Sequence, residues 1–218
     1  MTQSAIVPYV VVEGVIGVGK TTLVQQLARA WNARHVLEEF DDNPFLTAFY
    51  EDPARMAFAT EMFFLIQRFN QQELFAQQDL LQRVAVSDYL FDKSRIFAGL
   101  TLTEHELALF DRVYTLLRPQ VPAPDLVVYL HAPLQTVMQR IASRGRAFEE
   151  PITTDYIDAL DRAYRRHLAS IPSAQLVMID TANVDFRQPR IVERLCTLLV
   201  NGRRGDLTPE LASGPVLH

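Results

Sequence analysis

The chain has almost no cysteine and no long apolar segment. Cys196 is the single cysteine among 218 residues, so an internal disulfide is excluded and we expect a reducing compartment, with Cys196 in the core. No apolar run approaches the roughly 18 residues that a membrane-spanning helix needs, and residues 1–8 lack the basic region of a secretory signal. These absences favour a cytoplasmic protein with no membrane partner.

An excess of positive charge is also missing. The 21 Lys and Arg residues are outnumbered by 26 Asp and Glu residues, which gives a formal net charge of −5. Proteins that bind nucleic-acid polymers usually carry a basic surface, so we exclude such a polymer as a partner, and any small anion must be bound by a local cluster of cations. The hydrophobic content of 49% is ordinary for a globular enzyme.

A glycine-rich segment stands out at residues 14–21, where G-V-I-G-V-G-K-T fits the phosphate-binding pattern G-x-x-x-x-G-K-[ST]. It lies between a predicted strand at residues 6–13 and a predicted helix at residues 21–32. In such loops the lysine reaches the terminal phosphates and the Thr hydroxyl can hold Mg²⁺. We therefore expect ATP and Mg²⁺ as cofactors, and a binding loop made of Gly14, Val15, Ile16, Gly17, Val18, Gly19, Lys20, Thr21 and Thr22.

Acidic residues follow two further predicted strands. Residues 35–39 form a short strand pattern that ends in Glu38 and Glu39, and residues 84–88 form another that ends in Asp88. Ligands gather at the carboxyl ends of strands in doubly wound parallel sheets, so these carboxylates are site candidates, although Glu38 and Glu39 could equally form a solvated turn. Asp88 could hold Mg²⁺ through water or accept a proton from an attacking hydroxyl.

A buried helix is predicted from Pro53 to about residue 82, because its middle is apolar on all sides. Glu61 and Arg68 stand inside it, on one face and roughly 10.5 Å apart along the axis. A buried charge is costly without a partner. A polar ligand lying between the two side chains would supply that partner, and so would other residues of the fold.

An arginine cluster follows a fourth predicted strand at residues 125–131. Arg140 and Arg144 share a helix face, and Arg146 comes after Gly145. Like charges at this spacing destabilise a bare helix, so the cluster makes sense if a polyanion neutralises it, and the glycine suggests a flexible lid. The alternative is a solvated basic face.

Strands and helices alternate along the rest of the chain. We expect helices at residues 103–117, 153–169 and 188–200, a fifth strand at residues 176–179, and a charged connector that contains Asp92, Lys93 and Arg95. This alternation predicts an α/β fold in which a parallel sheet lies between two layers of helices. Residues 1–200 should form a single domain and residues 201–218 a mobile tail.

Phosphoryl transfer requires in-line positioning and positive charge on the transferred group. Lys20, Mg²⁺ and the three lid arginines would supply that charge, and an acidic residue would activate the acceptor. The set therefore favours a small-molecule kinase over a motor or switch ATPase, which would not need a polar pair inside a buried helix.

Between residues 9 and 200 the chain resembles the deoxynucleoside kinase family, particularly its bacterial purine-directed members. The residues that carry the resemblance are Gly14 to Thr22, Glu38, Asp41-Asp42-Asn43-Pro44, Phe49-Tyr50-Glu51-Asp52-Pro53, Phe58, Arg68, Asp88 and Arg140-x-x-x-Arg144-Gly145-Arg146. The resemblance implies a P-loop kinase fold with a five-stranded parallel sheet, an arginine-bearing lid, a helix-mediated homodimer and a deoxynucleoside substrate.

The resemblance also implies roles for individual residues. Glu38 matches a glutamate near the sugar 5′-hydroxyl and Asp88 matches an acidic general base. Tyr50 and Glu149 match residues that hold the 3′-hydroxyl, and Arg68 matches an arginine that reads the base. The lid is matched by Arg140, Arg144 and Arg146.

Two positions depart from the family pattern. The family usually has arginine after the catalytic acid, whereas here Asp88 precedes Tyr89, and we expect Lys93 or Arg95 to supply the missing cation. Many members have glutamine where this chain has Glu61. An ionised carboxylate only accepts hydrogen bonds, and guanine offers two adjacent donors, so we expect purine over pyrimidine and guanine over adenine.

Two other functions remain open. A nucleoside monophosphate kinase, of the thymidylate kinase type, would need a cation for the phosphate of its acceptor, for which Arg55 or Arg68 is available. An ATP-binding regulatory module without turnover would bind ATP and form no ADP. The intact set of Lys20, Thr21 and Asp88 argues against the second of these.

Overall fold

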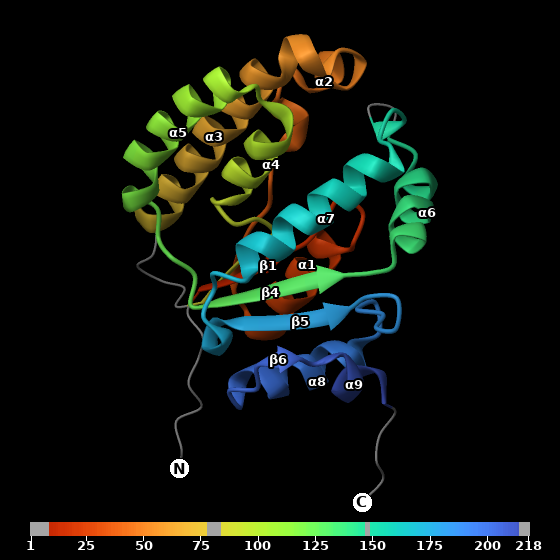
Figure 1. Ribbon diagram of the computed structural model, residues 1–218. Coiled ribbons are helices and arrows are strands. Elements are labelled where there is room, and N and C mark those ends of the chain that lie inside the picture. The colour runs from red at the N-terminus through yellow and green to blue at the C-terminus, as the bar shows by residue number, and fades with distance from the viewer. Residues whose placement is uncertain (1–8, 78–83, 147–148, 214–218) are drawn as a thin grey trace, which may run out of the picture.

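The computed structural model describes residues 9–77, 84–146 and 149–213, which form one parallel sheet between two layers of helices (Figure 1). The described strands pair in the order β2-β3-β1-β4-β5-β6, and all pairs are parallel. Their bounds are β1 (Tyr9–Glu13), β2 (Arg34–Val36), β3 (Ala85–Ser87), β4 (Leu126–His131), β5 (Leu176–Asp180) and β6 (Gly205–Asp206).

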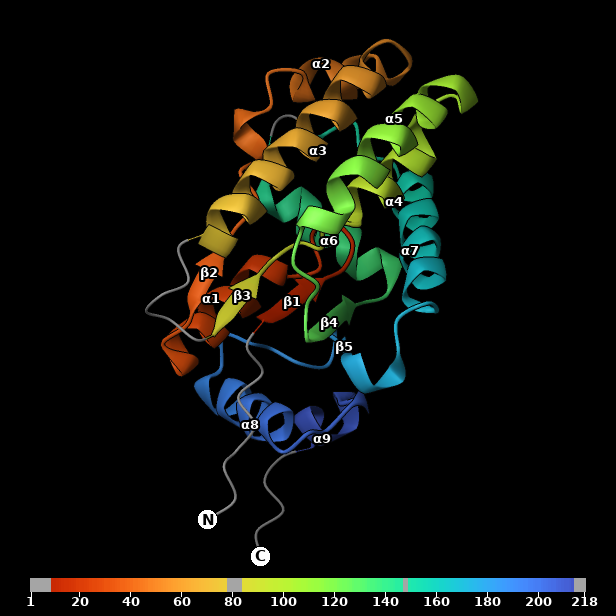
Figure 2. The same cartoon turned by 90° about the vertical axis from the view of Figure 1, so that its left-hand side faces the viewer.

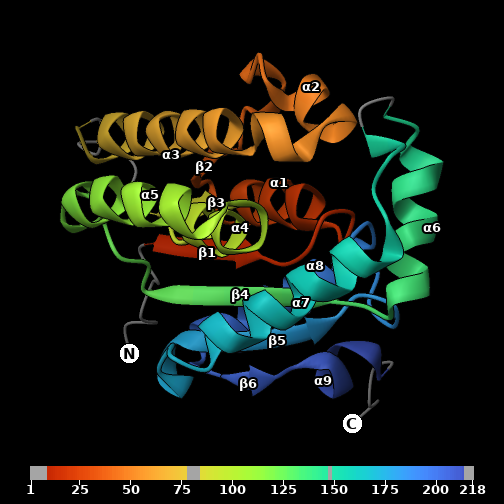
Figure 3. The same cartoon turned by 45° about the horizontal axis from the view of Figure 1, so that its top comes forward.

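The helices lie on both faces of the sheet. On one face α1 packs against α8, and on the other α4 packs against α7, with α3 and α5 against α4 (Figures 2 and 3). Their bounds are α1 (Lys20–Trp31), α2 (Leu46–Glu51), α3 (Pro53–Gln77), α4 (Lys93–Thr101), α5 (Glu104–Leu117), α6 (Leu134–Arg144), α7 (Thr154–Leu168), α8 (Pro189–Val200) and α9 (Thr208–Ala212).

The central strands are covered on both sides. All five residues of β1 are buried, and so are residues 126–130 of β4, which explains why both strands have continuous apolar runs. Apart from α4, β6 and α9, the order of strands and helices is the predicted one, and a capping box of Thr103 and Glu106 starts α5. The predicted helix at residues 53–82 is α3, and residues 78–82 lie outside the described part.

The described sheet has six strands rather than the predicted five, because the predicted tail contributes one. In β6, Gly205 and Asp206 pair with Val177 and Met178 of β5. The α9 helix then packs on α8, with Leu207 and Leu211 buried. The glycines and prolines of this segment are typical of a tail, but two leucines spaced one helical turn apart, Leu207 and Leu211, anchor it to the core. Residues 201–213 therefore do not form a separate tail.

The predicted charged connector at residues 92–95 is wrong for a similar reason. Residues 93–101 form α4, whose Ile96 and Ala98 are buried. Lys93 and Ser94 are buried as well, so polar residues at the start of a helix had concealed its apolar face. Because α4 packs against α3 and α7, it brings the Lys93 side chain to the carboxyl edge of the sheet.

In the described part of the chain, no helix is both long enough and apolar enough to cross a membrane.

Candidate active site

The phosphate-binding loop is closely packed beneath its glycines. Gly14 has a φ of 147° and Gly17 a φ of 82°, both in the region that favours glycine. A Cβ atom at Gly14 would lie 2.3 Å from the Leu130 carbonyl oxygen, so a side chain there would displace the loop from β4. Lys20 Nζ donates to the carbonyl oxygens of Gly14 at 2.8 Å and Val15 at 3.1 Å. Burial, with the neighbouring charge of Lys93, lowers the pKa of Lys20 to about 8.

A cavity of about 800 Å³ opens on one side of this loop. Its walls come from the loop, α6, the segment after β5 and the end of α9, and its size suits a nucleotide. Arg140 fixes two of these walls together: its Nη1 donates to Thr181 Oγ1 at 2.7 Å and to the Val18 carbonyl at 3.2 Å, and its Nη2 donates to the Thr181 carbonyl at 2.7 Å. Arg140 therefore joins α6 to the phosphate loop and to the segment after β5, and its predicted part in a lid stays a prediction. We call this space the donor cavity.

A second cavity lies on the other side of the loop, under α3 and α4, and we call it the acceptor cavity. All six residues predicted to bind the acceptor line it: Glu38, Tyr50, Glu61, Arg68, Asp88 and Glu149. The two cavities share the part of their lining formed by Gly17, Lys20, Thr21, Arg144 and Arg146. These five residues mark the junction at which a group can pass from one cavity to the other.

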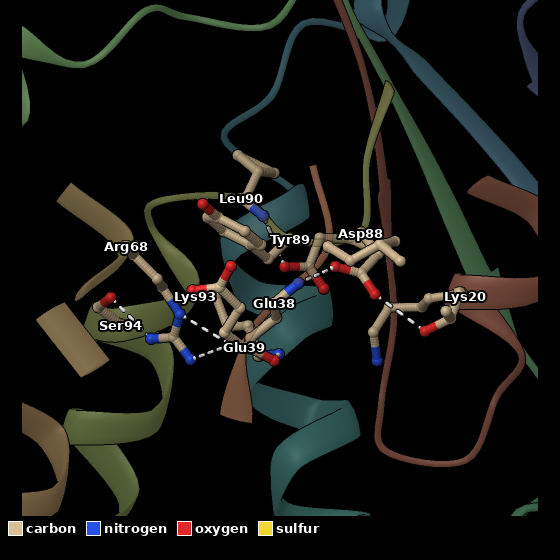
Figure 4. Close-up of polar contacts among 12 residues, drawn as sticks. Lys20, Glu38, Glu39, Arg68, Asp88, Tyr89, Leu90, Lys93 and Ser94 are labelled. Atoms are coloured by element: carbon tan, nitrogen blue, oxygen red, sulfur yellow. Dashed lines mark hydrogen bonds and ion pairs between the residues drawn. The ribbon is translucent and has the colours of Figure 1, made fainter. Parts of the chain in front are cut away.

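Glu38 is held between two cations in the acceptor cavity (Figure 4). Arg68 donates to Glu38 Oε1 from Nε at 2.9 Å and from Nη2 at 2.5 Å, and Lys93 Nζ donates to Oε2 at 2.5 Å. Burial of Glu38 raises its pKa, but Lys93 and Arg68 outweigh burial and hold the pKa well below the ordinary value. The Glu38 carboxyl is therefore ionised at neutral pH.

Glu61 and Arg68 do not share a partner between them. Arg68 pairs with Glu38 and donates from Nη1 to Ser94 Oγ at 2.7 Å, while Glu61 Oε1 accepts from Thr101 Oγ1 at 3.1 Å. Each side chain thus has a partner elsewhere in the fold, which was one of the two readings of the sequence. These contacts leave Arg68 one N–H on each terminal nitrogen.

Lys93 and Arg95, the two candidates for the missing cation, lie on different sides of α4. Lys93 is 5% exposed and pairs with Glu38 inside the acceptor cavity. Arg95 pairs with Asp111 of α5, and both side chains are more than a third exposed. Only Lys93 is positioned to act on the site.

Asp88 connects the two acidic strand ends to the phosphate loop. Its Oδ2 accepts from Thr21 Oγ1 at 2.9 Å, and its Oδ1 accepts from the Glu38 backbone N–H at 2.8 Å. Among the described residues no group of three or more His, Cys, Asp or Glu side chains could hold a metal ion. The hydroxyl and carboxylate oxygens of Thr21 and Asp88 nevertheless fit Mg²⁺, which binds few protein oxygens and keeps water and phosphate as its other ligands.

Arg144 and Arg146 both pair with Glu149, and each side chain remains about a third exposed. Arg144 bonds both carboxylate oxygens of Glu149, at 2.5 Å and 2.6 Å from Nη2 and 3.1 Å from Nε. Arg146 Nη1 lies 3.5 Å from the same carboxylate, and its guanidinium lies 4.1 Å from the centre of the Phe40 ring. Gly145, with a φ of 66°, ends α6 between them.

Sequence analysis missed two polar residues of the site. Glu13 is fully buried and accepts from the backbone N–H groups of Gly14 and Leu90, each at 2.9 Å, so it joins the phosphate loop to the segment after β3. Thr181 follows β5 and anchors Arg140. Both stand at carboxyl ends of strands, and the strand-end rule that selected Asp88 would have selected them.

Sequence and fold both relate this chain to known proteins. Residues 10–198 match the family described as deoxynucleoside kinase. The chain is 34% identical over 184 residues to the deoxyguanosine kinase of Bacillus subtilis, covering 82% of this chain and 89% of that protein. It is 26% identical to the deoxyadenosine/deoxycytidine kinase of the same species, with coverages of 89% and 94%. A structure of deoxyadenosine kinase from M. mycoides with bound dCTP has a TM-score of 0.74 at 19% identity, covers 88% of this chain and 98% of that chain, and has the same fold.

Proposed function

This chain belongs to the deoxynucleoside kinase family, whose members are phosphotransferases that act on a nucleoside hydroxyl, and we propose that it transfers the γ-phosphoryl group of ATP to the 5′-hydroxyl of a purine deoxynucleoside. Deoxyguanosine is the favoured acceptor and deoxyadenosine the next, in a reaction that salvages nucleosides. The observation that supports this most is the junction of the two cavities at Lys20, Thr21, Arg144 and Arg146. In this proposal ATP occupies the donor cavity and the nucleoside occupies the acceptor cavity.

Positive charge at the junction stabilises the transferred group. Lys20 lies on the loop that surrounds the phosphates, and Arg144 and Arg146 approach from the end of α6. Arg144 and Arg146 are the arginines that we assign to the phosphoryl oxygens, and Tyr50 and Glu149 are assigned to the sugar 3′-hydroxyl, since all four line the acceptor cavity. Magnesium, held by Thr21 and Asp88, would neutralise phosphate charge.

Glu38 is the residue that we assign to accept the proton of the 5′-hydroxyl, in place of Asp88. Asp88 is bonded to Thr21 on the donor side, whereas Glu38 is bonded to Arg68 and Lys93 on the acceptor side. A carboxylate with two cationic partners is a weak base. It is sufficient because phosphoryl transfer passes through a loose transition state in which little proton transfer is needed early.

A nucleoside monophosphate kinase is the alternative within the same fold. Its acceptor phosphate would need a cation of its own in the acceptor cavity. Of the described cations that line it, Lys20 bonds two carbonyl oxygens of the phosphate loop, Arg68 and Lys93 pair with Glu38, and Arg144 and Arg146 pair with Glu149. Arg55, the other candidate, is exposed on α3. This distribution favours a neutral acceptor. A regulatory module without turnover is the second alternative, and the contact between Thr21 and Asp88 disfavours it.

The test of this function measures ADP formation with ATP and Mg²⁺ for the four deoxynucleosides and their monophosphates in parallel. Turnover with the purine deoxynucleosides and none with the monophosphates supports the proposal. Turnover confined to a monophosphate would establish the alternative kinase, and ATP binding without ADP from any acceptor would establish the regulatory module.

A homodimer is also proposed, through α3 and α5. Among the side chains that the structure describes on these helices, three large apolar ones are at least about half exposed: Ile66 at 48%, Leu109 at 50% and Leu116 at 73%. Because α3 and α5 pack against each other, exposed apolar residues on the two helices are compatible with a shared interface. Light scattering should give the mass of two chains, and a mass of one chain would contradict the dimer.

The segment after Gly202 should affect ATP and not the nucleoside. Leu211 and Ala212 of α9 line the donor cavity and are absent from the acceptor cavity. Ending the chain at Gly202 should raise KM for ATP about tenfold, equivalent to ~1.4 kcal/mol, and leave KM for the deoxynucleoside within about twofold. The loss of buried Leu207 and Leu211 should also lower Tm.

A chain that ends at Ser213 is the matched control, because it keeps α9 and removes only the residues beyond it. It should have the kinetics of the full chain. Equal increases in KM for both substrates would contradict a role confined to the donor cavity.

A further inference from the structure

Glu61 lies at the end of the acceptor cavity that is distant from the phosphate loop. Arg68 of α3 bonds Ser94 of α4, and Glu61 of α3 bonds Thr101 of α4. The two helices are thus antiparallel here, and the two contacts are separated by seven residues on each helix, roughly 10.5 Å. Arg68 holds Glu38 near the junction. An acceptor whose reacting hydroxyl is beside Glu38 therefore extends its other end toward Glu61.

The hydrogen bonds around Glu61 suit either of its protonation states. Thr101 Oγ1 carries one hydrogen and lies 3.1 Å from both Glu61 Oε1 and the Phe97 carbonyl oxygen. When Glu61 is ionised, the hydroxyl can donate to the carboxylate. When Glu61 is protonated, the hydroxyl can donate to the Phe97 carbonyl and accept from the carboxyl group. In both protonation states of Glu61, the O–H groups of Thr101 and Glu61 therefore point at acceptors and not at each other.

Burial raises the pKa of Glu61 to about 7, although Arg68, the Thr101 hydroxyl and Lys93 act in the opposite direction. The two cations have limited effect because Glu38 neutralises both. The charged and titratable groups that face Glu61 are Arg68 on α3, Lys93 on α4, Glu38 after β2, Tyr50 on α2 and Tyr156 on α7. The three charged groups among them are already paired with one another, so Glu61 is the group in this set that changes its charge near neutral pH.

We propose that proton uptake by Glu61 selects the purine, so that the enzyme prefers guanine when Glu61 is ionised and gains activity toward adenine when Glu61 is protonated. This inference rests on the function proposed above. In the proposed function the enzyme prefers guanine at every pH. The present inference is that this preference depends on pH through the charge of Glu61.

Complementarity with the two bases supplies the reason. Guanine presents N1–H and an amino group side by side, and an ionised carboxylate accepts from both. Adenine presents an amino group beside an unprotonated N1, so its lone pair repels the carboxylate. A protonated Glu61 donates to N1 of adenine and accepts from the adenine amino group. With guanine, the same O–H of Glu61 would face an N–H donor of the base. Each base therefore has one protonation state in which a buried hydrogen bond is lost.

The experiment measures kcat/KM for deoxyguanosine and deoxyadenosine, with ATP saturating, from about pH 5.5 to about pH 8.5, a range centred on the titration of Glu61. The ratio of the two values cancels every titration that both substrates share, including that of Lys20. We expect the ratio of deoxyguanosine to deoxyadenosine to rise at least about tenfold with pH, as expected when one buried hydrogen bond is exchanged.

Two variants make the test specific. Glu61→Gln should give a ratio that does not change with pH and that is lower than the high-pH ratio of the wild type. Thr101→Val removes a hydrogen bond that favours the ionised form, so the midpoint should move to higher pH. A titration that persists unchanged in Glu61→Gln would overturn the proposal.

Unfolding provides a readout that needs no substrate. Because the folded state keeps the Glu61 proton up to about pH 7 and the unfolded state releases it at about 4.5, the wild type should lose stability relative to Glu61→Gln as pH rises through this window, with no change below or above it. A constant difference would overturn the titration of Glu61. Turnover of both purines at a constant ratio would overturn this inference alone. No turnover of either purine at any pH would overturn the proposed function and this inference together.

Discussion

Replacing Glu38 with glutamine should lower kcat by about three orders of magnitude, because removal of a general base typically costs a factor of 10² to 10⁴. The amide cannot accept the 5′-hydroxyl proton at neutral pH, and it also leaves the buried cations Arg68 and Lys93 without their counter-ion. The measurement is single-turnover phosphoryl transfer with the nucleoside saturating, which separates the chemical step from product release.

Two companion variants separate the base from the metal ligand and from the fold. Asp88→Asn should raise the Mg²⁺ concentration needed for half-maximal rate, since Asp88 lies against Thr21, whereas Glu38→Gln should leave that concentration unchanged. Combining Glu38→Gln with Lys93→Met removes one unpaired cation, so Tm should recover while the rate stays low. A strong Mg²⁺ dependence in Glu38→Gln would instead place Glu38 on the metal.

Lys93→Met should lower kcat/KM for the deoxynucleoside by about a hundredfold, in line with the loss of one charged group aimed at a transition state. Lys93 orients Glu38 through its bond to Oε2 and contributes positive charge close enough to Lys20 to lower the pKa of that lysine. Methionine has a similar length, and Glu38 keeps Arg68 as a partner, so Tm should change little.

Arg95→Met is the matched control, two residues along the same helix. Because Arg95 pairs with Asp111 on the outer side of α4, its kcat/KM should stay within about twofold of the wild type, as is usual for an exposed ion pair. A loss in Arg95→Met as large as that in Lys93→Met would show that the missing cation is not supplied from inside the cavity.

The phosphate loop and the acidic strand ends could be predicted from the sequence because each signal is local. A predicted strand precedes residues 14–21 and a predicted helix follows them, and Asp88 directly follows an apolar run. The carboxyl ends of parallel strands meet at one edge of the sheet, so residues at the ends of different strands are expected to lie close together.

The arrangement of Glu38, Arg68 and Lys93 could not be predicted in the same way. It depends on how α3 lies against α4, and nothing in either segment states that the two helices are antiparallel with Arg68 beside Ser94. Lys93 was selected as a possible cation and yet placed in a connector, because four polar residues at 92–95 concealed the apolar face of α4. The roles of Leu207 and Leu211 could not be predicted for a related reason. The β6 strand and the α9 helix are too short to show a clear hydrophobic period.

A competition among the four deoxynucleosides tests whether the enzyme phosphorylates the 5′-hydroxyl of purine deoxynucleosides. All four are supplied at equal concentration with limiting ATP and Mg²⁺ at about pH 8, above the pKa of Glu61, and the nucleotide products are separated and identified. We expect deoxyguanosine 5′-monophosphate as the main product and deoxyadenosine 5′-monophosphate as the next. A pyrimidine 5′-monophosphate as the main product, or phosphate at the 3′-position, would contradict it.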